Sequence, residues 1–289
     1  MNIKKRNILL KNRLRDLSIS RKNLNSGFCS FYLQAFKMEV IRKFKLKLQR
    51  RKHGIVSTNI ETISTCNRKC EFCFNHPRFE PRSQGNMETE TWNRIIDQLA
   101  EIKFAGRISP HFFNEPLLEK RLPQLLQYAR QKLPCSWLQI NSNGDFLTEE
   151  LFLKLIASGV NYFFVTNYDE IEKPQLNMLQ SKYPAFIKVV KNSDMWRTDR
   201  GGEIFHKQKV LKSPCLRPGA QLVVNWQGEM LLCCMDFYAH YSFGNLKTDN
   251  FREIFDSVKF QAVRSEIAES RQNGVALCHN CDDPGKIPW

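Results

Sequence analysis

The stretch Cys66-Asn67-Arg68-Lys69-Cys70-Glu71-Phe72-Cys73 decides how this chain is interpreted, because it places three thiols within eight residues. Thiolates at this spacing can hold three irons of a cubane iron–sulfur cluster and leave the fourth iron without a protein ligand. An open metal position can bind a substrate or cofactor directly, whereas a site closed by four protein ligands cannot. Spacing alone also permits half a zinc site, or a disulfide pair with one cysteine to spare.

Composition bounds the class of protein. With 289 residues, 42% of them hydrophobic, the chain is long enough for one large domain or two smaller ones. No apolar run approaches the roughly 18 residues that span a bilayer. The short run Ile8-Leu9-Leu10 is followed at once by basic residues, so it does not form a signal-peptide core. We therefore expect a cytoplasmic protein, and in that compartment a content of ten cysteines favours metal ligands over disulfides.

The net charge of +15 is concentrated at the N-terminus. Residues 1–53 hold sixteen Lys and Arg against Asp16 and Glu39, whereas the rest of the chain holds 28 basic and 27 acidic residues. Apolar and basic residues alternate from Phe31 to Leu48 in a helix-compatible pattern, which predicts a basic helical extension over 1–53. Such a helix suits contact with an anionic membrane surface or partner, or packing of its apolar stripe on the main domain. Nucleic acid is disfavoured, because no recognised nucleic-acid motif accompanies the charge.

From residue 55 onward, short apolar strands alternate with amphipathic helices. We expect strands at 55–63, 107–112, 137–141, 161–166 and 185–190, and helices at 89–104, 117–131 and 147–157. This alternation predicts a parallel sheet with right-handed crossovers, closed into a full or partial barrel. Active sites of such barrels lie at the C-terminal ends of the strands. Polar residues follow successive strands there, and we expect them to share a pocket: Asn114-Glu115-Pro116, Asn141-Ser142-Asn143-Gly144-Asp145 and Thr166-Asn167.

Beyond Arg200-Gly201-Gly202 the regular alternation of strands and helices ends. We expect a hairpin of strands 221–226 and 229–232, turned at Gln227-Gly228, and then a helix over 251–267. The boundary falls near residues 203–214, which divides the chain into a body at 54–205 and a tail at 206–289. Four cysteines of the tail would also make an acceptable zinc site: Cys215, Cys233, Cys278 and Cys281.

Together these motifs resemble the radical S-adenosylmethionine superfamily. Its members carry CxxxCxxC after the first strand of a partial (β/α)6 barrel, with an aromatic residue before the third cysteine, here Phe72. Their second strand ends in Gly-Gly-Glu-Pro or a variant, here Phe113-Asn114-Glu115-Pro116. The resemblance implies an α/β fold and a [4Fe-4S] cluster on Cys66, Cys70 and Cys73, whose open iron binds S-adenosyl-L-methionine.

The tail resembles the twitch form of the SPASM auxiliary-cluster domain. That form has a cysteine, a hairpin glycine, a second cysteine and a terminal CxxC, here Cys215, Gly228, Cys233, Cys278 and Cys281. The resemblance implies a small hairpin-plus-helix domain with a second [4Fe-4S] cluster, fully ligated and suited to electron transfer. Beside the CxxxCxxC triad, this favours a cluster over zinc.

Within the superfamily, residues 55–282 resemble dehydrogenases that act on aminocyclitols in aminoglycoside biosynthesis, although residues 167–198 match poorly. The implied reaction is abstraction of hydrogen from a carbinol carbon of an aminocyclitol or sugar-like substrate by a 5′-deoxyadenosyl radical, with the auxiliary cluster accepting an electron to give the ketone. A flavodoxin- or ferredoxin-type protein would donate the initiating electron. Implied cofactor-binding residues are Phe72, Asn114, Glu115, Asn143 and Asn167.

Two residues are candidates for the catalytic role. Arg200 matches by motif an arginine near the substrate hydroxyl, and because arginine is almost never deprotonated we expect it to stabilise developing oxyanion character. Asp236 is the alternative proton acceptor.

Other functions remain open. One is radical maturation of a ribosomally made peptide, although residues 1–53 are short and basic for a peptide-binding segment. A second is epimerisation, with the Cys234 thiol returning a hydrogen atom. A third is a zinc-dependent binding module without enzymatic activity.

Overall fold

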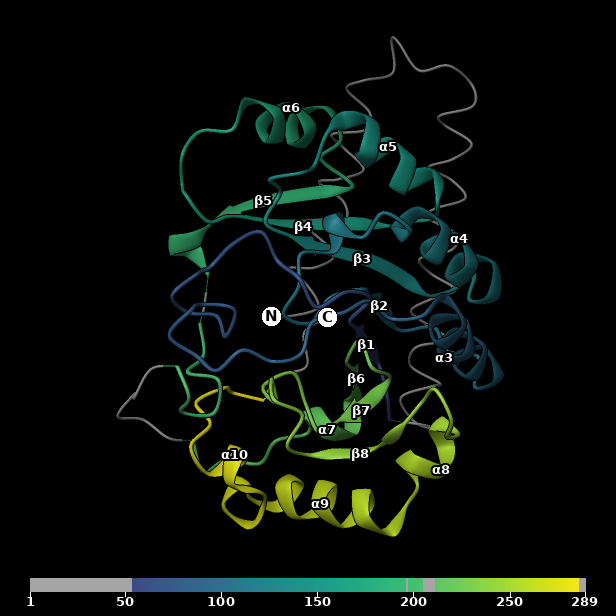
Figure 1. The fold of residues 1–289 in the computed structure, drawn as a ribbon, viewed down its shortest axis with the longest axis vertical. Helices are drawn as coiled ribbons and strands as arrows, with labels where there is room; N and C mark the ends of the chain where they lie inside the picture. The colour runs from purple at the N-terminus through teal and green to yellow at the C-terminus, as the bar shows by residue number, and fades with distance from the viewer. Residues whose placement is uncertain (1–53, 196, 205–210, 286–289) are drawn as a thin grey trace, which may run out of the picture. The chain divides into compact units, whose positions relative to one another are not determined.

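Eight strands form one sheet in the order β5-β4-β3-β2-β1-β6-β7-β8 (Figure 1). The computed structural model describes residues 54–195, 197–204 and 211–285, so the expected helical extension at 1–53 lies outside the described residues. Five neighbouring strands are parallel: β1 Ser57–Ile60, β2 Arg107–Ser109, β3 Trp137–Ser142, β4 Tyr162–Asn167 and β5 Ile187–Lys191. The prediction of an α/β fold built on a partial parallel barrel is confirmed.

Helices connect the parallel strands and cover one side of the sheet (Figure 1). They are α3 Thr89–Glu101, α4 Leu122–Lys132, α5 Glu149–Ala157 and α6 Pro174–Lys182, with short 3₁₀ turns η1 Pro116–Leu118 and η2 Asn192–Asp194. On α3, apolar residues recur at helical spacing, and Trp92, Ile95, Ile96 and Leu99 are buried. The Trp92 indole donates a hydrogen bond to the Leu125 carbonyl at 2.9 Å, which fastens α3 to α4.

The C-terminal part continues the barrel sheet. β6 Gln221–Val224 pairs in parallel with β1, and β7 Glu229–Leu231 and β8 Ser242–Asn245 follow in antiparallel. Around them lie α7 Arg217–Ala220, α8 Phe251–Phe255, α9 Val258–Glu269, η3 Arg271–Asn273 and α10 Ala276–His279. The expected hairpin is present, but its first strand also serves as a sixth parallel strand.

The two faces of the sheet differ in chemistry. Alternate residues such as Ile60, Ile108 and Leu222 belong to the main apolar core with the helices. Val223, on the opposite face, belongs to a second cluster made largely of aromatic rings: Phe74, Phe112, Phe113 and Phe237. The face that carries Val223, called the concave face below, therefore holds aromatic and polar side chains, and it holds the candidate site.

Several predicted elements differ in extent. The expected helix at 117–131 is split into η1 and α4, and the expected helix at 251–267 is split into α8 and α9. Ser257 makes the second break, because its hydroxyl caps α9 by accepting a hydrogen bond from the Phe260 amide. The expected first strand, 55–63, is paired as β1 only over Ser57–Ile60. None of the described helices is both long and apolar enough to cross a membrane.

Candidate active site

The cysteine loop leaves the C-terminal end of β1. Cys66, Cys70 and Cys73 are partly buried, and the Arg68 amide donates to the Cys66 sulfur at 3.4 Å. Burial raises the pKa of the Cys66 thiol to about 11, and burial likewise raises the pKa of Cys70. Metal binding must therefore displace thiol protons. The three soft sulfur donors on one short loop fit an iron–sulfur cluster.

Arg68 ties this loop to two other strand ends. Its guanidinium is 2.6 Å from Asp145, in the loop after β3, and 2.5 Å from Asp169, after β4. Lys173 adds a contact to Asp145 at 2.7 Å. Burial opposes ionisation of Asp145, but hydrogen bonds from Arg68, Lys173 and Asn67 bring its pKa below the usual range. The cysteine loop is therefore held by a charged network that its own motif does not contain.

Glu115 joins three segments at the rim of the barrel. Its buried carboxylate accepts hydrogen bonds from the Ser142 hydroxyl at 2.7 Å, the Asn143 amide at 2.8 Å and the Leu117 amide at 3.0 Å. Its own amide donates to the Thr65 carbonyl at 3.0 Å, just before the cysteine loop. Burial raises its pKa, and these hydrogen bonds oppose the rise. A carboxylate has about four acceptor positions, so room remains for one more donor.

The three expected asparagines are used differently. Asn143 donates to Asn67 at 2.8 Å, and Asn114 accepts from the Phe112 amide at 2.8 Å, so both side chains serve the protein's own loops. Asn167 donates to the Ile171 carbonyl at 2.7 Å, but its Oδ1 atom is buried and has no hydrogen-bond partner among the described residues. A buried acceptor without a donor is costly, which makes Asn167 the asparagine best placed for a ligand.

Phe72 lies on the same side of the barrel as Tyr168. The centroids of the two rings are 5.5 Å apart, and the Arg197 guanidinium lies 3.8 Å from the Phe72 centroid. An aromatic face covered by a cation gives a rigid wall beside the third cysteine.

Arg200 reaches the aromatic cluster of the concave face. Its guanidinium lies 5.2 Å from the Phe113 ring centroid and 3.6 Å from the Met235 sulfur. Its backbone is left-handed, with φ 54°, an uncommon conformation for a non-glycine residue. No carboxylate of the described residues pairs with this guanidinium, so its charge remains available to a bound molecule.

Sequence reasoning missed Arg107 and His111. They lie two residues either side of Ser109, and this period-two pattern was the available signal for one shared face. His111 Nδ1 is 3.0 Å from the Ser109 hydroxyl and 3.2 Å from the Asn141 amide nitrogen. Burial, with Arg107 and Arg200 adding to it, lowers the pKa of His111 to about 3, so its ring is neutral. The Arg107 Nε atom is buried without a hydrogen-bond partner among the described residues.

The four cysteines of the tail line a single cavity. Cys215, Cys233 and the pair Cys278 and Cys281 come from three separate segments and meet there. Two arginines share the cavity. Arg217 pairs with Asp283 at 2.6 Å. Arg271 is buried, lies 3.5 Å from the Cys281 sulfur and has an Nη2 atom without a hydrogen-bond partner among the described residues.

This donor set fits a bound iron–sulfur cluster. Four soft thiolates suit iron, and the unpaired guanidinium donor suits the negative charge of a cysteine-ligated cluster. Within the described part of the chain, no three His, Cys, Asp or Glu side chains are grouped closely enough to hold one metal ion. A cubane needs no such grouping, because each cysteine binds a different iron.

A cavity of about 160 Å³ is lined by sequence neighbours of both cysteine sets. Phe74, which follows Cys73, lines it, and so do Met235 and Leu277, which lie close in sequence to Cys233 and Cys278. Asp236 also lines it, with its two oxygens accepting hydrogen bonds from the His240 and Tyr241 amides, each at 2.9 Å. Burial raises the pKa of Asp236. None of the seven cysteines lines this cavity itself.

Cys234 follows the ligand candidate Cys233 in the sequence. It packs against the aromatic cluster, and its sulfur accepts a hydrogen bond from Arg217 at 3.5 Å.

Comparison with known families and proteins agrees with this geometry. Residues 60–166 match the radical SAM superfamily, and residues 215–282 match the SPASM iron–sulfur cluster-binding domain. The chain is 29% identical to the S-adenosyl-L-methionine-dependent 2-deoxy-scyllo-inosamine dehydrogenase of Niallia circulans, over 78% of this chain and 91% of that protein. It is 24% identical to the PqqA peptide cyclase of Granulibacter bethesdensis, over 75% of this chain but 56% of that protein.

Solved structures give the same picture. The crystal structure of BtrN in complex with AdoMet and 2-DOIA matches with a TM-score of 0.74 and 29% identity, over 80% of this chain and 94% of that one. BtrN in an open conformation matches with a TM-score of 0.64 and 26% identity, over 81% of this chain and 98% of that one. The radical SAM domain implies a [4Fe-4S] cluster and S-adenosylmethionine, and the SPASM domain implies an auxiliary cluster. The chain carries a radical SAM superfamily domain at residues 60–166 and a C-terminal SPASM domain at residues 215–282, and it is an oxidoreductase.

Proposed function

We propose that this enzyme oxidises a secondary alcohol of an aminocyclitol or sugar-like substrate to the ketone. The observation that carries the proposal is the presence of two cysteine sets, three cysteines after β1 and four that line one cavity in the tail, because oxidation of an alcohol needs one site that generates a radical and another that accepts an electron. The similarity to the dehydrogenase of Niallia circulans extends over nearly all of that protein, which supports the same class of reaction. The substrate loses one hydrogen atom, one proton and one electron.

The two cysteine sets would hold different clusters. Cys66, Cys70 and Cys73 would hold the open cluster, and Cys215, Cys233, Cys278 and Cys281 would hold one closed auxiliary cluster. When bound, these groups and S-adenosylmethionine supply a 5′-deoxyadenosyl radical and a one-electron acceptor. Around them, Glu115 offers its remaining acceptor position to the methionine ammonium group, and Asn167 Oδ1 accepts from a cofactor hydroxyl.

Two residues would assist loss of the hydroxyl proton. Arg200 keeps its own proton and stabilises negative charge that develops on the substrate oxygen. Asp236 is the alternative proton acceptor: burial favours its protonated form, but both of its oxygens already accept backbone hydrogen bonds. Arg200 is therefore the better candidate, and substitution of each residue separates the two roles.

The test is anaerobic turnover with a panel of aminocyclitols and sugars, read by mass spectrometry. The proposal predicts a product lighter by two hydrogens, formed together with 5′-deoxyadenosine. The double variant Cys278→Ala/Cys281→Ala should still form 5′-deoxyadenosine but should lose the ketone, because the electron then has no acceptor. Ketone formed at the wild-type rate by that variant would overturn the role of the auxiliary site.

Epimerisation is a second candidate, favoured by the placement of Cys234 against the aromatic cluster. In ordinary water, epimerisation gives a product with the same mass as the substrate. In deuterated water, the product should gain one deuterium from the solvent, and Cys234→Ala should not form this product. Peptide maturation predicts instead that a peptide, not a polyol, stimulates cleavage of S-adenosylmethionine.

A further inference from the structure

The turn that carries Arg200 packs closely against the tail. Arg200, Gly201 and Gly202 are three successive residues in the left-handed region, with φ of 54°, 78° and 89°. A Cβ added at Gly201 would lie 2.6 Å from the Leu277 Cδ1 atom, and one added at Gly202 would lie 2.9 Å from the Asn280 Cβ atom. The backbone of this turn, called the Arg200 turn below, therefore lies directly on the segment that carries the terminal CxxC.

Two aspartates join the same two segments by paired backbone hydrogen bonds. The Asp199 amide donates to the Asp282 Oδ1 atom at 2.9 Å, and the Asp282 amide donates to the Asp199 Oδ1 atom at 3.4 Å. Asp199 Oδ1 also accepts from the Gly201 amide at 3.1 Å. The two aspartates are buried, with exposed fractions of 1% and 6%. Asp199 precedes Arg200 and Asp282 follows Cys281, so the pair links the candidate catalytic residue to the auxiliary site.

A methionine connects the Arg200 turn to a second cysteine segment. The Met235 sulfur lies 3.6 Å from the Thr198 hydroxyl oxygen and 3.6 Å from the Arg200 guanidinium. The Met235 amide donates to the Cys233 sulfur at 3.4 Å. The stretch 198–202 therefore contacts two of the three segments that supply the auxiliary cysteines.

The element that carries the terminal cysteines is short. α10 is four residues long, and a helix of this length is marginal without further contacts. Metal bound to Cys278 and Cys281 would fix this stretch, because metal binding and local folding are coupled in small metal sites. Asp282 follows directly, so the position of its carboxylate depends on the same step.

We propose that Asp199 and Asp282 are positioning residues, which hold Arg200 in place for the substrate only when the auxiliary site is loaded. The inference rests on the proposed function, because that function gives Arg200 its role at the substrate oxygen. The auxiliary site then has a structural role besides accepting an electron, since it sets the position of the guanidinium charge. Position matters here, because a displacement of about 1 Å can lower a rate about a hundredfold.

Alanine and asparagine variants separate position from proton transfer. Each backbone hydrogen bond of the pair ends on one oxygen of a carboxylate, the Oδ1 atom. Asparagine has nearly the same shape and keeps a carbonyl oxygen, but it does not take up or release a proton. We therefore expect Asp199→Asn and Asp282→Asn to keep the Arg200 turn in place, whereas Asp199→Ala and Asp282→Ala release it.

Hydrogen exchange measures the Arg200 turn without any substrate. The full chain is reconstituted with iron and sulfide, and deuterium uptake is followed by mass spectrometry in peptides that cover residues 197–204. We expect the protected amides to exchange about tenfold faster in Asp199→Ala, Asp282→Ala and Cys278→Ala/Cys281→Ala, which is the effect of losing one buried hydrogen bond. The two asparagine variants should exchange at the wild-type rate.

Turnover gives the second readout. Asp199→Ala should lower kcat for ketone formation about tenfold with a smaller change in KM, and it should form more 5′-deoxyadenosine for each ketone. Asp199→Asn should recover the rate to within about threefold of the wild type, since its oxygen still accepts the backbone hydrogen bonds. The electron paramagnetic resonance signal of the auxiliary cluster should be the same in both variants, which shows that the tail is intact.

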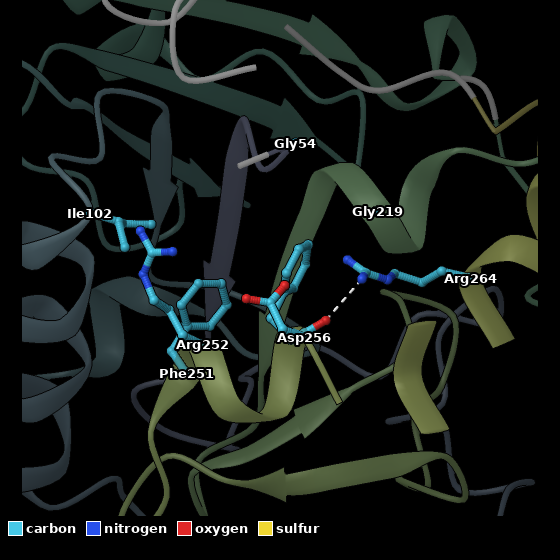
Figure 2. A pocket seen from close by; sticks show the side chains of 8 residues that line it. Gly54, Ile102, Gly219, Phe251, Arg252, Asp256 and Arg264 are labelled. Carbon is cyan, nitrogen blue, oxygen red and sulfur yellow. Dashed lines mark hydrogen bonds between the residues drawn. The ribbon is translucent and has the colours of Figure 1, made fainter. Parts of the chain in front are cut away.

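Asp256→Ala is the matched control, because it makes the same chemical change elsewhere in the tail. Asp256 caps the end of α8, and Figure 2 shows it with Arg252 and Arg264 on either side, at a cavity of about 320 Å³. Neither aspartate of the pair lines this cavity, and no residue of the Arg200 turn does. The control should leave hydrogen exchange in residues 197–204 and ketone formation unchanged.

Equal losses in the asparagine and alanine variants would overturn the proposal, because the carboxyl proton and not the position would then matter. Exchange in residues 197–204 that does not depend on Cys278 and Cys281, or that rises equally in Asp256→Ala, would overturn it as well. The exchange experiment contains no substrate, so failure to find an oxidised alcohol does not alter its result. Conversely, wild-type exchange and turnover in all four aspartate variants would refute the positioning role and leave the proposed function standing.

Discussion

At the scale of single residues, Arg68 does more than fill a position between two cysteines. It makes four hydrogen bonds to Asp145 and Asp169, which are 77 and 101 residues away in sequence. We predict that Arg68→Ala lowers the free energy of unfolding by about 2 kcal/mol, because charge-assisted hydrogen bonds are lost at the cysteine loop. Iron content after reconstitution and chemical denaturation measure the effect. Arg68→Lys keeps the positive charge but loses the forked guanidinium donors. Its stability and iron content should therefore lie between those of the wild type and Arg68→Ala.

His111 provides a test by pH. The pKa of His111 in the folded protein is about 3, below its ordinary value of 6.5. Between these two pH values the unfolded chain binds a proton on His111 and the folded chain does not. Stability from this group is therefore complete above pH 6.5 and declines as the pH falls toward 3. Between about pH 7.5 and pH 5.5 the wild-type protein should lose about 1 kcal/mol more stability than His111→Gln. Parallel losses in the two proteins, measured by denaturant unfolding, would contradict the neutral ring.

Arg200 tests the chemistry. Arg200→Gln should lower kcat for ketone formation about a hundredfold with a smaller change in KM, since the charge matters most when the substrate oxygen becomes negative. Formation of 5′-deoxyadenosine should continue and become uncoupled from product. Arg200→Lys should recover part of the rate. An equal loss in both variants, or a pure change in KM, would assign Arg200 to binding instead.

At the scale of elements, sequence patterns predicted those parts of the fold that local chemistry determines. The apolar face of α3 and the strand ends that carry Glu115 and Asn143 follow from periodicity and motif. α6 was not predicted, because only Leu176 and Leu179 among its residues are buried and its apolar stripe is weak. Arg68 gave no signal either, since its carboxylate partners come from distant loops. Arg107 and His111 share a period-two pattern with Ser109, but the sequence does not show which face of β2 borders the site.

The loop between β3 and α5 is the element on which the rim depends most. Gly144 has φ +75°, and a Cβ added there would lie 2.6 Å from Val165 Cγ1. Gly144→Ala therefore adds a left-handed backbone cost of about 1–2 kcal/mol to a steric clash. We expect lower thermal stability and weaker S-adenosylmethionine binding, because Asn143 and Asp145 flank this residue and contact the cysteine loop. Gly219→Ala is the control, since its position has open space. Equal effects of the two variants would contradict the argument.

At the scale of the whole molecule, the barrel and the SPASM domain share one sheet. β6 pairs with β1 over four residues, and flanking hydrogen bonds join Val56 to Ala220 and Glu61 to Val224. Leu222 and Val224 of β6 belong to the same apolar core as the barrel helices. The resemblance of each segment to a separate family does not reveal this, because pairing between distant strands is not encoded in either motif. The two cysteine sets are held at a fixed separation by continuous backbone pairing.

This shared sheet predicts that the barrel does not fold without the tail. Ending the chain after residue 204 removes Leu222, Val224, Met230 and Leu232 from the core, where each is at most 1% exposed. At about 1.5–3 kcal/mol for each buried side chain, the loss is comparable to the total stability of about 5–15 kcal/mol of a typical domain. The β1 edge would also lose its partner and become prone to aggregation. The truncated chain should lack a cooperative thermal transition by circular dichroism and should be digested rapidly by protease. The full chain should unfold in a single transition. A truncated chain that unfolds cooperatively and retains a four-iron cluster on Cys66, Cys70 and Cys73 would show that the barrel is independent.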